Sequence, residues 1–100
     1  MSEYIKASRL AVSAAGHDKG TVYVVLQEED DRVLVADGRL KVLAKPKAKN
    51  PKHLQMIIHL DGQLLKQMEQ IKDDADLRRI LRQYRMSSLK STQEVMHVKD

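Results

Sequence analysis

The fold is decided by the stretch from Arg9 to Leu26, which reads RLAVSAAGHDKGTVYVVL. Two apolar runs flank a polar segment that begins at Gly16 and ends at Gly20. Glycine adopts positive φ without steric penalty, so this segment predicts a tight turn between two antiparallel strands. The rest of the chain can be understood as closing that hairpin into a small barrel.

The second apolar run carries side chains on two faces. One face holds Val22, Val24 and Leu26. The opposite face holds Tyr23 and Val25, because successive side chains of a strand alternate. Both faces are apolar and rich in β-branched residues, which predicts a strand that is covered on both sides or bent into a tight barrel.

Further short strands are predicted along the first half of the chain. Asp37 and Gly38 form a two-residue hairpin signal, and the strand after them should turn Leu40, Val42 and Ala44 toward the core. Short strands at this spacing favour an SH3-like five-stranded barrel. The strands are expected at residues 9–14, 21–27, 32–36, 39–45 and 53–58.

Beyond Leu60 the apolar period changes from two to about 3.6, which predicts helices. Asp61 is a plausible N-cap for the first helix. Three aspartates suit the start of a second helix: Asp73, Asp74 and Asp76. The expected apolar stripe of the first helix is Leu64, Leu65, Met68 and Ile71, and that of the second is Leu77, Ile80, Leu81 and Tyr84.

The predicted fold class is therefore mainly β with an α extension. We expect residues 1–59 to form the SH3-like barrel and residues 60–86 to form a helical hairpin packed on it. Residues 87–100 are polar and weakly patterned, which predicts a flexible tail.

Composition excludes several classes of protein. The chain has 100 residues and no cysteine, which removes disulfides, thiolate catalysis and cysteine-based zinc sites. No window approaches the roughly 20 apolar residues of a membrane span, and the first residues lack the apolar core of a secretory signal. We therefore expect a cytoplasmic protein without membrane contact.

The net charge of +4 is unevenly distributed. Residues 45–52 contain two prolines, which remove backbone donors and predict a loop. Segregated cations of this kind are typical of a polyanion binder. For the lysines we favour a polyanion contact over a solvated loop, and for the arginines a solvated helix face over a second contact surface. One basic stretch, without a carboxylate, is Lys41, Lys45, Lys47, Lys49 and Lys52; the other is Arg78, Arg79, Arg82 and Arg85.

The glycine-bracketed turn and the strand after it carry a resemblance to a known family. Val12, Gly16, the run Asp18–Gly20, Val22 and Val24 match the pattern of the KOW motif of ribosomal and transcription proteins. Over residues 6–58 the chain resembles bacterial KOW-domain RNA-binding proteins, which are similar to a KOW-containing large-subunit ribosomal protein of archaea and eukaryotes. The resemblance implies an SH3-like barrel and a role in translation, within or beside a ribonucleoprotein particle.

We therefore expect an RNA-binding protein, with structured ribosomal RNA as the ligand and ribosomal proteins as possible neighbours. Only three tyrosines and no other aromatic residue are present, so contacts should go to the RNA backbone rather than to stacked bases. The candidate RNA-binding residues are Lys19, Lys41, Lys45, Lys47, Lys49, Lys52, His17, Arg9 and Arg39, with a possible second surface at Arg78, Arg82 and Arg85.

Nothing in the sequence indicates catalysis. The four histidines lack zinc-binding spacing, no serine lies in a nucleophile elbow, and no phosphate-binding glycine loop is present. We expect no catalytic residue, no metal, no cofactor and no small-molecule substrate. The alternative function is a KOW protein-interaction module of a transcription or translation complex, in which the helical extension would dock on a partner protein.

Overall fold

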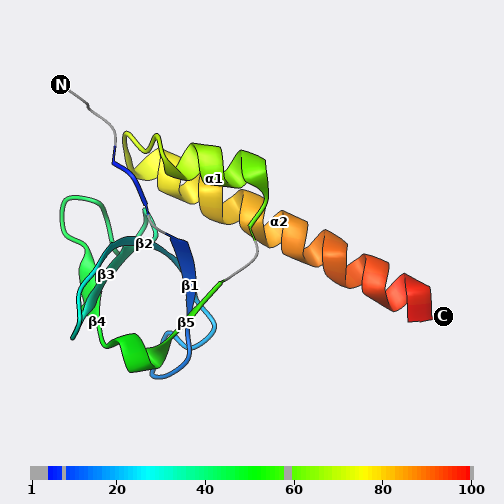
Figure 1. The fold of residues 1–100 in the computed structure, drawn as a ribbon, viewed down its shortest axis with the longest axis horizontal. Helices are drawn as coiled ribbons and strands as arrows, with labels where there is room; N and C mark the ends of the chain where they lie inside the picture. Colours follow the sequence, from blue (N-terminus) through cyan, green and yellow to red (C-terminus); the bar gives the residue numbers. More distant parts are fainter. Residues whose placement is uncertain (1–4, 8, 58–59, 100) are drawn as a thin grey trace.

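The computed structural model describes residues 5–7, 9–57 and 60–99. Within these residues one antiparallel sheet is followed by two α-helices (Figure 1). The strands are β1 (Arg9–Ser13), β2 (Val22–Glu28), β3 (Val33–Ala36), β4 (Lys47–Lys49) and β5 (Leu54–Met56). The helices are the 3₁₀ helix η1 (Pro51–His53), α1 (Gly62–Met68) and α2 (Asp74–Lys99).

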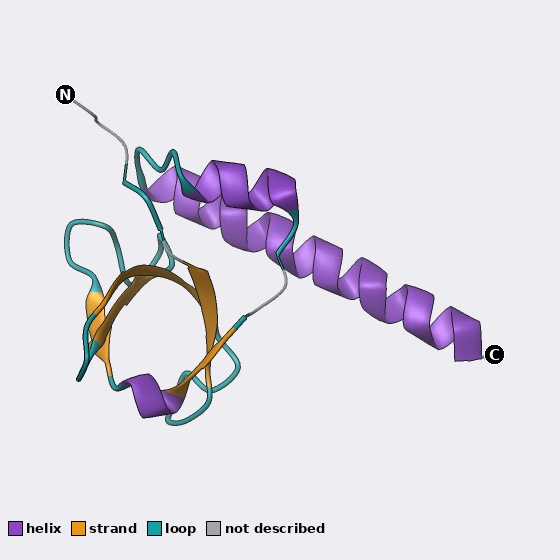
Figure 2. Cartoon of the chain, viewed as in Figure 1, coloured by secondary structure: helices purple, strands orange, loops and turns teal. Residues whose placement is uncertain are grey.

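The five strands form a curved sheet in the order β4-β3-β2-β1-β5. Figure 2 shows the strands wrapping around an open half-barrel, with η1 connecting the two edge strands. The register between β2 and β3 shifts between Val25 and Gln27, which leaves an extra residue in β2. Such a bulge bends a strand and increases its twist, so it contributes to the curvature of the sheet.

Strand β2 separates two hydrophobic cores. Val24 is fully buried in a core that includes residues of both α-helices, with Val22 and Leu26 packed against it. Tyr23 and Val25 are buried in a second core, formed on the concave side by side chains of β1, β2, β3 and β5. The alternation predicted for this strand is confirmed, because each of its faces has its own core.

The prediction of a fourth strand at residues 39–45 was wrong. In the structure this segment is a loop, and Leu40, expected in the core, is 90% exposed. Asp37 explains the difference: its Oδ1 accepts the backbone N–H groups of Arg39 (2.9 Å) and Lys41 (3.0 Å). Local acceptance of these donors competes with a strand ladder, so the chain turns instead of pairing.

The fourth strand lies instead inside the segment that we expected to be a loop. Lys47–Lys49 pairs with β3 and forms an edge of the sheet. Pro46 and Pro51 flank this short strand without interrupting it, which an edge position allows. The predicted closing strand is confirmed over Leu54–Met56, and its expected end at Ile58 lies outside the described residues.

The first helix begins where the sequence predicts. Asp61 is the N-cap of α1, with its Oδ1 accepting the N–H of Gln63 at 3.5 Å. Two members of the expected apolar stripe behave differently from the prediction. Leu65 is 43% exposed, and Ile71 lies beyond the end of α1, where its backbone pairs with Ile5.

The second helix begins at Asp74 and packs beside α1. We expected a flexible tail from residue 87, but in the structure α2 continues through Lys99, and Asp100 lies outside the described residues. Residues 87–99 contain neither glycine nor proline, so no residue of this segment breaks the helix. Figure 1 shows α1 and the first half of α2 lying over one side of the sheet, while the second half of α2 extends away from it.

Candidate nucleic-acid interface

The turn between β1 and β2 is stabilised by a carboxylate. Gly16 (φ +84°) and Gly20 (φ +93°) supply the positive φ angles that bring the chain back. Asp18, between them, accepts hydrogen bonds from Ser13 Oγ (2.9 Å) and from the Tyr23 hydroxyl (2.6 Å). Both donors are side chains of the flanking strands β1 and β2.

Lys49 completes this network from the edge strand β4. Its Nζ lies 2.5 Å from Asp18 Oδ2, and the two side chains are only 13% and 22% exposed. The hydrogen bonds from Lys49 and from Tyr23 hold the pKa of Asp18 well below its ordinary value. Burial, together with the Asp18 carboxylate, raises the pKa of the Tyr23 hydroxyl well above its ordinary value. The positive charge of Lys49 is therefore largely neutralised inside the protein.

A first cationic depression surrounds this network, and we call it the lysine depression. Its volume is ≈ 420 Å³, and it opens at the end of the half-barrel where the β1–β2 turn lies. Lys41 adds a further contact, with its Nζ 5.3 Å from the centroid of the Tyr23 ring, a distance at which cation–π attraction acts. The lining residues are Ala15, Gly16, His17, Asp18, Lys41, Lys47, Lys49 and His53.

Four of the predicted RNA-binding residues therefore meet in one place, although they come from separate segments. They are His17 from the β1–β2 turn, Lys41 from the β3–β4 loop, and Lys47 and Lys49 from β4. His53, at the end of η1, joins them, although the sequence analysis gave it no role in binding. Its position next to Lys52, at the end of the basic stretch, is the signal that could have identified it.

The other predicted contacts on the barrel lie elsewhere. Lys19, Lys45 and Lys52 are exposed but do not line the lysine depression. Arg9 is the first residue of β1, whereas the β1–β2 turn follows the last residue of that strand. The Nε of Arg9 pairs with Glu28 Oε2 at 2.9 Å. The structure thus separates Arg9 from the lysine depression.

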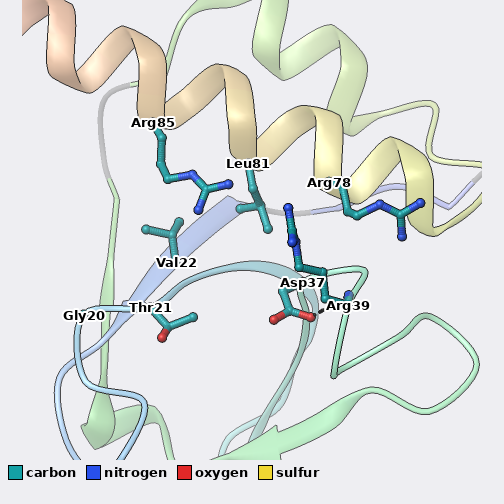
Figure 3. Close-up of a pocket in the computed structure, with 8 residues that line it drawn as sticks. All are labelled: Gly20, Thr21, Val22, Asp37, Arg39, Arg78, Leu81 and Arg85. Carbon is teal, nitrogen blue, oxygen red and sulfur yellow. Dashed lines mark hydrogen bonds between the residues drawn. The ribbon is translucent and has the colours of Figure 1, made fainter.

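A second cationic depression, the arginine depression, lies between α2 and the β3–β4 loop. It has two adjoining parts of ≈ 430 Å³ and ≈ 290 Å³, which share Arg39, Arg78 and Arg85. Figure 3 shows Arg39 rising from the loop toward α2 and Arg85 pointing from α2 toward the sheet. The predicted second surface at Arg78, Arg82 and Arg85 is thus joined by Arg39, which was predicted as part of the first.

The β3–β4 loop is held closely against the beginning of α2. Arg78 donates from Nη1 to the carbonyl oxygen of Gly38 at 2.5 Å, and the N–H of Leu43 donates to Asp74 Oδ1 at 2.8 Å. Gly38 has φ +80°, and a Cβ built on it would lie 2.5 Å from the carbonyl oxygen of Asp74. This close approach requires glycine and fixes Arg39, the next residue, beside the helix.

The arginines differ in what they contact. Arg78 is bonded to the Gly38 carbonyl, and Arg79 pairs with Asp76 at 3.1 Å. Within the described residues, the guanidinium groups of Arg39, Arg82 and Arg85 have no hydrogen-bond or ion-pair partner. The guanidinium groups of these three arginines are therefore available to bind an anionic ligand.

The comparisons with known proteins return no family. No model of a protein family matches the chain, and a search of curated proteins finds no relative. Among the described residues, no group of three or more histidines, cysteines or carboxylates could hold a metal ion. No helix in the described part of the chain is both long enough and apolar enough to cross a membrane.

Proposed function

We propose that this protein binds structured RNA through phosphate contacts made by the lysine depression. The observation that carries the proposal is the convergence of Lys41, Lys47 and His17 from three separate segments on one depression. Lysine binds phosphate as a mobile point charge, and phosphate contacts supply most of the affinity of nonspecific nucleic-acid binding. The proposed ligand is ribosomal RNA, on the KOW resemblance of the β1–β2 turn and its flanking strands.

The curved five-stranded sheet is compatible with the SH3-like barrel that this resemblance implies. In such a protein the sheet acts as a rigid support, and the turn and loops at one end present the cations. Lys49 has a structural part in this proposal, because its charge is already paired with Asp18. Lys41 and Lys47 are the residues that would contact phosphate, with Lys19, Lys45 and Lys52 available on neighbouring exposed segments.

The aromatic residues support recognition of the backbone rather than of bases. Tyr23 is 1% exposed, and Tyr84 is half-buried against the core beneath the helices. Tyr4 lies outside the described residues. Neither described tyrosine offers an open ring face on which a base could stack.

The proposal is tested by the salt dependence of binding to a structured ribosomal RNA fragment. The double variant Lys41→Gln/Lys47→Gln should lower the slope of log affinity against log salt by roughly 1.4 to 1.8, because each lost phosphate contact removes about 0.7 to 0.9. The matched control is Lys66→Gln/Lys72→Gln, which removes the same charge from exposed residues outside both depressions. Equal slopes for the two double variants would contradict the proposed role of the lysine depression.

A second candidate function is a protein-interaction module. The observation that favours it is the second half of α2, which extends beyond the sheet and α1 as a free-standing helix (Figure 1). In that case a partner protein would dock on the helical extension. Sedimentation of cell extract distinguishes the two: the lysine double variant leaves ribosomal particles if RNA holds the protein, and stays with its partner if the helix does.

A further inference from the structure

We propose that the arginine depression is a second phosphate-binding site, which takes a backbone phosphate of the same RNA between the β3–β4 loop and α2. The inference rests on the proposed RNA binding and extends it from the barrel to the helix. Arg39 would hold the phosphate from the loop, and Arg82 and Arg85 would hold it from the helix.

The chemistry of the lining residues favours a phosphate. A guanidinium presents a planar fork of donors that matches two phosphate oxygens, so arginine binds phosphate with defined geometry. Five arginines line the larger part of the depression, and among the described residues the only other one in its lining is Ala75. Mutual repulsion of these cations is unfavourable in the free protein, and a bound anion would relieve it.

Two carboxylates lie beside these arginines in the described residues, and both are engaged: Asp76 pairs with Arg79, and Asp37 is bonded within its own loop. Asp37 lines the smaller part of the depression, but its Oδ1 accepts the backbone N–H groups of Arg39 and Lys41. These bonds hold the carboxylate within its own loop. Asp37 thus orients the segment that carries Arg39, and the guanidinium of Arg39 stays available for a ligand.

The depression is built from two elements whose relative position is fixed. The close approach of Gly38 to Asp74 and the bond from Arg78 to the Gly38 carbonyl join the loop to α2. Arg39 and Arg85 therefore face one space from two sides without movement of the backbone (Figure 3). The backbone of the site is therefore already ordered, and only the arginine side chains lose conformational freedom when the ligand binds.

The two depressions border the same two segments of the chain. In the β1–β2 turn, Asp18 lines the lysine depression and Gly20 lines the arginine depression. In the β3–β4 loop, Lys41 lines the first and Arg39 lines the second. An RNA strand crossing this turn and loop would therefore meet both sets of cations.

The experiment uses the full chain and the double variant Arg39→Gln/Arg82→Gln, which keeps Arg78 and its contact with the loop. The control is Arg32→Gln/Lys66→Gln, which removes the same charge from exposed residues outside both depressions. With the structured ribosomal RNA fragment, the arginine variant should lower the salt slope by roughly 0.7 to 0.9, the value for the one phosphate that the site holds, and the control should leave it unchanged.

A second readout uses pyrophosphate as a small probe at constant ionic strength. Pyrophosphate should shift the Nε–Hε resonances of Arg39, Arg82 and Arg85 and raise the melting temperature of the wild-type protein and of the control. Neither effect should occur in the arginine variant. Wild-type resonances that do not respond to pyrophosphate would overturn the site.

The outcomes separate this inference from the proposed function. An unchanged RNA slope in the arginine variant, with a reduced slope in the lysine variant, overturns the arginine site and supports the lysine depression. The reverse pattern supports the arginine site and contradicts the lysine depression. A wild-type protein without affinity for the RNA overturns both as RNA sites, even if pyrophosphate binds.

Discussion

The lysine depression and the arginine depression differ both in the cations that line them and in their internal neutralisation, since three lysines line the first and five arginines line the second. In the first, Asp18 pairs with Lys49 and removes one cation from the surface. In the second, Arg39, Arg82 and Arg85 have no ionic partner among the described residues. The basic stretch of the sequence has no carboxylate of its own, yet the fold brings one from the β1–β2 turn. The cations available to a ligand therefore depend on which acids the fold places beside them.

The difference extends to stability. The lysine depression contains the bonds that fix its own turn, since Asp18 joins Ser13, Tyr23 and Lys49. The arginine depression depends on the packing of the β3–β4 loop against α2, chiefly at Gly38. Substitutions in the two regions should therefore affect stability and binding in different proportions.

The largest loss of stability is expected from Gly38→Ala, which disturbs the packing of the β3–β4 loop against α2 beside the arginine depression. The new Cβ would lie 2.5 Å from the Asp74 carbonyl oxygen, and the residue would keep φ +80°. Left-handed strain and displacement of the loop together should reduce the free energy of unfolding by about 3 kcal/mol. Urea unfolding measures this loss, and RNA binding should fall because Arg39 moves away from α2.

The matched control is Gly20→Ala, which has φ +93° but no atom within 4 Å of the added Cβ. It should show the strain alone, at about 1 kcal/mol. Equal losses for the two variants would show that the contact with α2 does not determine the cost at Gly38.

The next largest effect is expected from Asp18→Asn, which changes the lysine depression. Loss of the carboxylate leaves the largely buried Lys49 without its partner and should reduce the free energy of unfolding by about 2 kcal/mol at neutral pH. A variant that is as stable as the wild-type protein at neutral pH would contradict this account. Because Lys49 is then unpaired, the salt slope for RNA should not fall.

The difference in stability between the wild-type protein and Asp18→Asn should depend on pH, because the pKa of Asp18 is lowered in the folded protein. Its contribution to stability is complete above the ordinary carboxyl value of 3.8 and is lost as pH falls from there toward the lower folded value. The stability of the wild-type protein should therefore approach that of Asp18→Asn in acid. Urea unfolding across the acid range measures the convergence, with exposed Asp31→Asn as the control that should show little of it.

A smaller effect is expected from Tyr23→Phe, which keeps the ion pair and removes one donor to it. Loss of the 2.6 Å hydrogen bond to Asp18 should reduce the free energy of unfolding by about 1 kcal/mol. The pKa of Tyr23 is raised on folding, so its contribution is lost as pH rises above the ordinary value of 10.0. The difference between wild type and variant should shrink there, as measured by urea unfolding on both sides of that pH.

The smallest effect is expected from Arg9→Gln. The side chains of Arg9 and Glu28 are 47% and 33% exposed, and such surface pairs contribute about 0.5 kcal/mol or less. Because Arg9 lies away from both depressions, the salt slope for RNA should not change. A drop in the slope comparable to that of one lysine would place Arg9 in the interface after all.

The sequence predicts the elements whose pattern is local. The alternation of β2, the glycine turn, the Asp61 cap and the start of the second helix depend on neighbouring residues, and the structure agrees with them. The β3–β4 loop was missed because its conformation depends on Asp37 accepting two backbone donors and on Asp74, far away in the sequence.

The same distinction between local pattern and tertiary structure applies to the candidate sites. The sequence identifies the cations, but not that Asp18 pairs with Lys49 or that Arg39 meets the arginines of α2. Both relations join residues more than thirty positions apart: Asp18 lies in the β1–β2 turn and Lys49 in β4, whereas Arg39 lies in the β3–β4 loop and its partners in α2. Pairings of this kind arise from tertiary structure, which residue spacing alone does not define.

The double burial of β2 also restricts the ways in which the chain can misfold. A slip of one residue against its neighbours would turn the Tyr23 hydroxyl toward the leucines of the helices and expel Val24 into the concave core. Both hydrophobic cores would then lose their packing together, so a shifted register keeps neither core intact. The same strand that divides the molecule into two interiors thereby commits both of them to one arrangement.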